Sequence, residues 1–143
     1  MIYTSYYSNM KQVLGRKPEI CFVSIAGYAP NWFEEWCEKM NLPHYQFKKL
    51  APKKEWWQVW HDKFADNLES DESVNFYTEK YYETILSNLD ASKIKFELLE
   101  KSDRRDVCLL CYETPDKFCH RSLVRKWLND NGIECAEFTS SKI

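Results

Sequence analysis

Three residues with chemically useful side chains, Cys119, His120 and Arg121, are consecutive near the carboxyl end of the chain. They follow a polar loop that contains Glu113, and that loop follows an apolar run ending in Cys111. A helix amino terminus lowers the pKa of a thiol, a histidine moves protons near neutral pH, and an arginine fork suits phosphate or carboxylate. We therefore predict a functional site in this segment. Its candidate catalytic residues are Glu113, Cys119 and His120, and its candidate ligand-binding residues are Arg121 and Cys111.

Two common uses of such cysteines are disfavoured by their spacing. Cys111, Cys119 and His120 offer three soft ligands for zinc, although two adjacent ligands are awkward to arrange. Cys108 should not complete the set, because strand residues three apart face opposite sides of a sheet. Cys111 as a nucleophile in a phosphate loop would need an arginine six residues later, and position 117 is lysine. We therefore expect neither a metal ion nor a phosphatase loop here, and the candidate residues favour anion binding.

Four apolar stretches have the composition of buried strands, and they cover residues 2–7, 19–26, 107–112 and 133–138. Helical patterns separate them, so consecutive strands must pair in parallel through crossover connections. The chain of 143 residues has the length of one domain. We therefore predict a single α/β domain over residues 1–143, of Rossmann-like type, with a mostly parallel central sheet flanked by helices.

The helices are predicted from apolar residues at helical spacing. One should run from Trp32 to Met40, a short one should carry Trp56, Trp57 and Trp60, and a longer one should begin near Ser73. The apolar stripe of the longer helix is Val74, Tyr77, Tyr81, Ile85 and Leu89, and Asp71 or Ser73 should cap its start. A further helix should follow Asp90 as its cap, and the last should span residues 119–131, with Gly132 as a left-handed stop.

Three more candidate ligand-binding residues lie near the ends of the first two predicted strands. Ser5 and Ser24 end those strands, and Tyr28 follows the second. Ligands of open parallel sheets bind beyond the carboxyl ends of the strands. These side chains are therefore expected to face the same cleft as Cys111, although serines at such positions also cap turns.

A basic segment, residues 44–55, has no clear periodicity and is predicted to be a loop. It contributes Lys49 as a candidate ligand-binding residue. Its lysines precede Trp56 and Trp57, and positive charge beside aromatic rings is typical of sites for nucleotides or single strands. The alternative is a solvated loop beside a core helix.

Composition limits the kind of partner. The formal net charge is −2, so no global positive field attracts nucleic acid, and anion binding must be local. The start has no signal-peptide pattern, and no apolar run is long enough to cross a bilayer, so we expect a cytoplasmic protein without a membrane partner. The cysteines mostly sit inside apolar runs, and we expect reduced thiols. They are Cys21, Cys37, Cys108, Cys111, Cys119 and Cys135.

Residues 109–113 and residues 119–124, joined by the polar loop, resemble the signature of the domain-of-unknown-function 488 family. Residues 2–6, 23–30 and 48–52 also resemble its short bacterial and phage members. The resemblance implies a compact Rossmann-like domain and a shared site at Glu113, Cys119, His120 and Arg121. It implies no activity. Where many members carry Asp-Val-Arg, this chain has Ser24-Ile25-Ala26, so a charged pair is missing, and Tyr28 or a lysine of the basic segment is a possible substitute.

These observations leave three functions open. The leading hypothesis is a cleft that binds a phosphate-bearing, nucleotide-like ligand or a nucleic-acid end, with hydrolase or transferase chemistry if it is an enzyme. The second is a non-catalytic protein that sequesters a nucleotide-derived ligand, as in conflict between phage and host. The third is a nucleic-acid or protein interaction module that uses the Lys48 to Trp57 patch. The sequence does not identify a cofactor.

Overall fold

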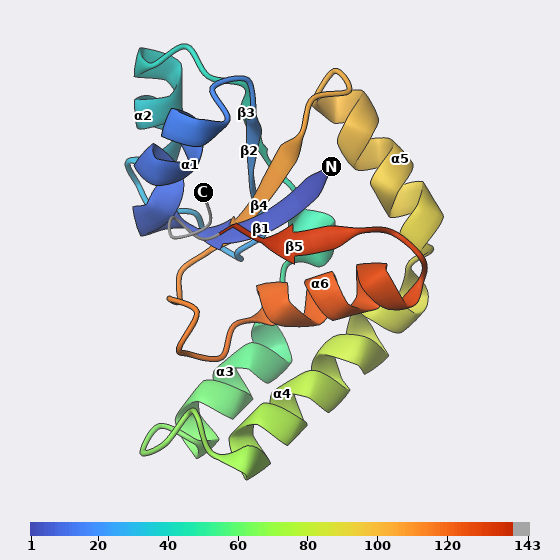
Figure 1. Ribbon diagram of the computed structural model, residues 1–143. Helices are drawn as coiled ribbons and strands as arrows, with labels where there is room; N and C mark the ends of the chain where they lie inside the picture. Colours follow the sequence, from blue (N-terminus) through green and yellow to red (C-terminus); the bar gives the residue numbers. More distant parts are fainter. Residues whose placement is uncertain (139–143) are drawn as a thin grey trace.

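The computed structural model describes residues 1–138, and its strands form one parallel sheet in the order β3-β2-β4-β1-β5 (Figure 1). The predicted α/β class and the parallel pairing are confirmed. In chain order the elements are β1 (Ile2–Tyr6), α1 (Met10–Arg16), β2 (Cys21–Ser24), α2 (Phe33–Lys39), β3 (His44–Gln46), α3 (Lys54–Lys63), α4 (Asp71–Thr84), α5 (Ala91–Lys101), β4 (Val107–Cys111), α6 (His120–Asp130) and β5 (Cys135–Glu137), with short 3-10 turns at Tyr7–Asn9, Lys48–Leu50 and Leu86–Asn88.

Helices cover both faces of the sheet, with α1 and α2 on one face and α5 and α6 on the other (Figure 1). The central strand β4 is buried along its whole length. Its side chains alternate between two cores, since Leu109 joins the α5–α6 core whereas Cys108 and Leu110 join the α1–α2 core. Cys108 therefore faces away from the α6 side, as its strand parity predicts.

Two elements were not predicted from the sequence. The segment 44–55 was expected to be a loop, but it contains β3, which pairs in parallel with β2 from Phe22 opposite His44. This edge strand has only three residues, all of them intermediate or exposed, so it has no apolar alternation. Helix α1 is also short, and only Met10 and Val13 of its residues are buried.

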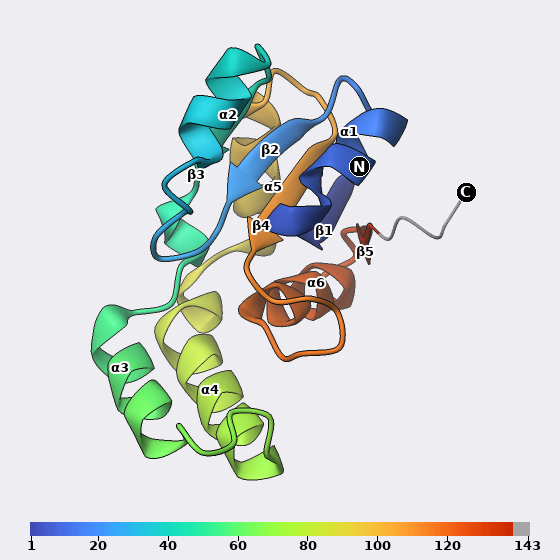
Figure 2. The same ribbon diagram turned by 90° about the vertical axis from the view of Figure 1, so that its left-hand side faces the viewer.

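Helices α3 and α4 form a hairpin that projects away from the sheet (Figure 2). The cap of α4 is Ser70, whose Oγ accepts from the backbone N–H of Ser73, so the expected caps Asp71 and Ser73 are wrong. The Ser73 hydroxyl instead accepts from Trp60 Nε1 at 2.9 Å. Helix α4 ends at Thr84, and a 3-10 turn at Leu86–Asn88 follows it. Ile85 and Leu89 of the predicted apolar stripe therefore lie outside the helix.

The element that carries the candidate site begins and ends close to its predicted bounds. Helix α6 starts at His120, with Cys119 as its extended N-cap residue rather than as part of the first turn. Gly132, with φ of +77°, follows its end in the left-handed conformation that was predicted. Asp90 caps α5 as expected, since its carboxylate accepts from the N–H groups of Ser92 and Lys93. Within the described residues, no helix is long and apolar enough to cross a membrane.

Candidate functional site

The candidate site lies where β4 ends and α6 begins, beyond the carboxyl edge of the sheet. Cys111 is the last residue of β4, Cys119 is the N-cap of α6, and His120 is its first residue. The sulfur atoms of Cys111 and Cys119 and one ring nitrogen of His120 all lie within 4.8 Å of one another. The polar loop therefore folds back and brings three residues from two elements into one cluster.

Cys111 and Cys119 are joined by a disulfide bond in the structure. The expectation that all six cysteines are reduced is wrong for this pair. Cys21, Cys37 and Cys135 are buried free thiols, and burial raises the pKa of each to about 12. Those three thiols are buried and hardly ionised near neutral pH, which makes them poor nucleophiles.

His120 is buried and held in one orientation. Its Nε2 lies 2.8 Å from the carbonyl oxygen of Ile25. Because a carbonyl only accepts, Nε2 must carry the proton, which leaves a lone pair on Nδ1. That atom lies 4.0 Å from Cys119 Sγ. Burial, followed by the charge of Arg121, lowers the pKa of His120 to about 4 against the opposing effect of the Ile25 hydrogen bond. The imidazole is therefore neutral near pH 7.

Arg121 lies beneath this cluster and is only 3% exposed. Its Nε and Nη2 donate to the carboxylate of Glu137 on β5, at 3.0 to 3.3 Å. Its Nη1 donates to Cys111 Sγ at 3.2 Å and to the backbone carbonyl of Glu113. Arg121 therefore holds the backbone of Glu113, whereas its carboxylate partner is Glu137.

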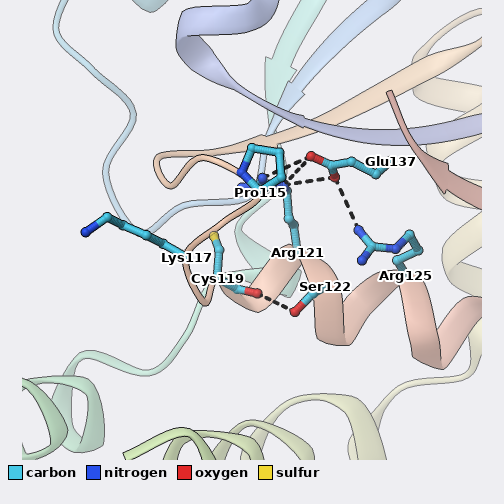
Figure 3. Close-up of a pocket in the computed structure, with 7 residues that line it drawn as sticks. All are labelled: Pro115, Lys117, Cys119, Arg121, Ser122, Arg125 and Glu137. Atoms are coloured by element: carbon cyan, nitrogen blue, oxygen red, sulfur yellow. Dashed lines mark hydrogen bonds and ion pairs between the residues drawn. The ribbon is translucent and has the colours of Figure 1, made fainter. Parts of the chain in front are cut away.

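A second arginine completes this ion pair. Arg125 Nη1 lies 3.2 Å from Glu137 Oε1 and 3.1 Å from Thr4 Oγ1. Figure 3 shows Arg121 and Arg125 meeting at Glu137 beside a small cavity of about 60 Å³, with Cys119 and Ser122 on its other side. This cavity is much smaller than a typical small-molecule site.

The larger cavity is a cleft of about 440 Å³ on the other side of Cys119. It lies between the loop after β4 and the α3–α4 hairpin, and Cys111, Cys119 and His120 line one end. A volume of this size is typical of small-molecule sites. Its lining includes six aromatic residues, which are Tyr28, Trp57, Trp60, Tyr77, Tyr112 and Phe118.

The candidate residues separate into two groups. Glu113 and Tyr28 line the cleft with the Cys/His cluster, and the carbonyl oxygen of Tyr28 accepts from Tyr112. Among the described residues, Ser5, Ser24 and Lys49 lie apart from the cleft lining. Ser5 is buried against Asn9, Ser24 is hydrogen-bonded to Tyr7 at 2.6 Å, and Lys49 pairs with Glu97 at 2.6 Å.

The basic patch is also divided. Lys54 and Trp57 line the cleft. Lys48 donates to the carbonyl of Gly27, and its Nζ lies 5.4 Å from the centre of the Tyr28 ring. The patch thus contributes side chains to the rim of the cleft rather than forming one continuous surface with Lys49.

Of the hairpin wall, Trp57 was proposed from the sequence as stacking surface, whereas Trp60, His61 and Tyr77 were not predicted as part of the site. His61 lies one helical turn after Trp57, and the two rings stack with centroids 5.0 Å apart and an interplanar angle of 15°. Trp60 and Tyr77 pack edge to face behind them. The four-residue spacing of Trp57 and His61 was the available signal, since it puts both rings on one face of a helix.

Together, the fold and the site define a Rossmann-like α/β domain with a buried Cys/His cluster at one end of an aromatic cleft. The chain belongs to the DUF488 family, because residues 25–132 match the family DUF488-N3a, described as the active DUF488-N3 subclade. This match confirms the resemblance drawn from the signature residues. Searches of curated proteins and of solved structures find no match.

Proposed function

We propose that the cleft binds a nucleotide-like ligand or a nucleic-acid end, and that hydrolysis or group transfer takes place at the Cys119–His120 end. One observation carries the proposal. The 440 Å³ cleft has aromatic side chains in its lining and reaches the Cys111–Cys119–His120 cluster, in which the neutral His120 has a lone pair on Nδ1. A planar ring fits between such walls, and its reactive atom would then lie near the cluster.

The aromatic walls favour a flat ligand over a flexible one. The Trp57 ring is only partly buried, and that of Tyr28 is 74% exposed at the rim. Partly exposed rings offer stacking surface to a base, and each stacked base contributes about 1–3 kcal/mol. The buried Trp60 ring packs against Trp57, with centroids 6.0 Å apart, and against the buried Tyr77.

The ligand's phosphate is assigned to the rim. Arg121 is buried and directs its donors at Glu137, Glu113 and Cys111, so its main role is to position the loop and β5. Lys54 lines the cleft and its side chain is exposed, and Lys48 lies next to Tyr28. Their charges suit a phosphate that stays partly in solvent.

The reaction would use His120 as the general base. Nδ1 can accept a proton from water or, after reduction of the disulfide, from the thiol of Cys119. Glu113 lines the same cleft and is exposed. The nucleophile formed there attacks a ring carbon of the ligand, the bond from that carbon to its leaving group breaks, and the proton taken up by His120 passes to the leaving group.

The test is a thermal-shift and calorimetric screen against nucleosides, mononucleotides, dinucleotides and short single strands. A true ligand raises the apparent melting temperature, because it binds the folded state alone. Trp57→Ala should weaken binding by roughly 5- to 150-fold, the equivalent of 1–3 kcal/mol. Phe96→Ala is the matched control, since Phe96 is an exposed aromatic residue on α5. No stabilisation across the panel would overturn the proposal.

The disulfide favours a second candidate, a protein that sequesters such a ligand without reacting with it. With Cys119 bonded to Cys111, the site holds no free thiol nucleophile. The two candidates differ in one measurement. Incubation with the bound ligand should yield product that His120→Ala fails to form, whereas a sequestering protein returns the ligand intact.

A further inference from the structure

We infer that, once Cys111 and Cys119 are reduced, their sulfur atoms and His120 Nδ1 bind one zinc-class metal ion in a three-ligand site that opens into the cleft. The donor atoms lie within 4.8 Å of one another. A tetrahedral ion with bonds of about 2.0–2.3 Å needs ligand atoms roughly 3.5–4 Å apart. Cys119 Sγ and His120 Nδ1 are already 4.0 Å apart.

The backbone at the start of α6 removes the objection to adjacent ligands. Cys119 is extended, with φ of −150° and ψ of 147°, whereas His120 is helical. The change of backbone conformation between them brings both donor atoms to the side that faces Cys111. Two neighbours in one regular helix or strand would point in different directions.

The surroundings of His120 are those of a metal-binding histidine. Its Nε2–H donates to the Ile25 carbonyl at 2.8 Å, and metal-bound histidines usually donate their second N–H to a carbonyl or carboxylate. This hydrogen bond leaves Nδ1 as the ligand atom and fixes the ring plane. The ring also packs against Tyr81, with centroids 5.5 Å apart.

The charges nearby also suit a dithiolate centre. Arg121 Nη1 donates to Cys111 Sγ at 3.2 Å, and such a hydrogen bond stabilises a thiolate. Arg121 and Arg125 share the single carboxylate of Glu137, so a positive charge remains beside Cys111 and favours the thiolate over the thiol. Two thiolates, one neutral imidazole and one divalent ion sum to zero charge.

The fourth coordination position faces the cleft, which all three residues line. Sites with three protein ligands and an open position are typical of catalytic zinc, whereas structural zinc has four protein ligands. The sulfur and imidazole donors select zinc-class ions over magnesium or calcium, which prefer oxygen. Metal binding at this position goes beyond the proposed function and does not depend on which ligand enters the cleft. The ion would occupy His120 Nδ1, so His120 acts as a general base only in the metal-free protein.

The redox balance is simple. The structure holds the disulfide, and a dithiol reductant supplies two electrons and two protons to give two thiols. Binding of the ion then releases both thiol protons. The oxidised protein should therefore bind no metal at this site.

The experiment titrates cobalt(II) into the reduced, metal-free full chain under anaerobic conditions, without nucleotide. We expect one ion per chain, a thiolate-to-cobalt absorption band, visible bands of four-coordinate cobalt, and displacement of cobalt by zinc. Cys119→Ser and His120→Ala should each weaken binding by at least roughly ten-fold. Cys37→Ala is the matched control, because Cys37 is a free cysteine in the α1–α2 core.

Three outcomes would overturn the inference: no thiolate band, equal binding by Cys119→Ser and the wild-type chain, or a disulfide that resists reduction while the protein stays folded. Circular dichroism of each variant separates loss of ligand from loss of fold. Nucleotide binding is measured separately on metal-free protein, so failure of the metal site and failure of the proposed function give different results.

Discussion

The guanidinium of Arg121 and the carboxylate of Glu137 form a buried ion pair between α6 and β5, with 3% and 16% of their side chains exposed. Nε and Nη2 of Arg121 contact the carboxylate. The remaining guanidinium nitrogen, Nη1, contacts the Cys111 sulfur and the backbone carbonyl of Glu113. This one arginine therefore ties an edge strand, the central strand and the site loop together. The geometry makes it a positioning residue for the Cys/His cluster.

Removal of one partner of the Arg121–Glu137 ion pair should destabilise the folded protein. Glu137→Gln leaves the Arg121 charge without its counter-charge in a buried place, and we expect a loss of about 3–5 kcal/mol in the free energy of unfolding. Urea denaturation measures it. The control is Lys126→Ala, which breaks the exposed pair of Lys126 with Asp130 and should cost less than about 1 kcal/mol. Equal losses in the two variants would contradict a structural role for the buried pair.

Stability should depend on pH through His120. Burial lowers its pKa to about 4 in the folded protein, whereas the unfolded chain has a value of about 6.5. Between these values the unfolded state binds more protons, so the free energy of unfolding falls as the pH falls from about 6.5 to 4. The loss should be on the order of 3 kcal/mol.

The measurement is chemical denaturation of metal-free protein at a series of pH values. His120→Gln, which does not titrate, should remove most of the slope in this window. A slope that is unchanged in His120→Gln would assign the effect to other groups.

Gly132 and Gly15 make a matched pair of backbone tests. Gly132 has φ of +77°, and a side chain in this conformation costs about 1–2 kcal/mol, so Gly132→Ala should destabilise the protein. Gly15 lies in α1 with nothing within 4 Å of an added methyl group. Gly15→Ala should therefore stabilise it by roughly 0.5–1 kcal/mol. Thermal melts of both variants check the opposite signs.

Thiol labelling should distinguish the cysteines after mild reduction. Cys119 is partly exposed, whereas Cys111 is 1% exposed. Burial raises the pKa of Cys21 and Cys37 to about 12, so few of those thiols are ionised near pH 8. We expect iodoacetamide to label Cys119 first in the folded protein, by peptide mass spectrometry. Labelling of Cys37 at the same rate would show that the chain opens before it reacts.

The central elements of the fold were predictable because their apolar patterns extend over whole strands and helices. Strand β4 is one continuous apolar run, and α6 has a clear apolar stripe with Gly132 after its end. Strand β3 was missed because three partly exposed residues at a sheet edge carry no period. Its existence depends on pairing with β2, which is a tertiary contact.

The site was predictable as a location but not in its details. Ser24 ends β2 and Ser5 is the last residue but one of β1. Both pair with Leu110 and so face the α1–α2 side, whereas Cys111 lies one residue further on. Neighbouring residues of a strand face opposite sides of the sheet, so these serines face away from the cleft that Cys111 lines. The bond between Arg121 and Glu137 depends on where β5 lies against β1, which no local pattern encodes.

The division of the cleft between two parts of the chain has an evolutionary consequence. The reactive cluster comes from residues 111–120, whereas the opposite wall comes from the hairpin of residues 54–84 (Figure 2). Substitutions at Trp57 or His61 would reshape the entrance while the hydrogen bonds of His120 and Arg121 stay intact. Selection can thus retune which molecule is admitted without rebuilding the groups that act on it.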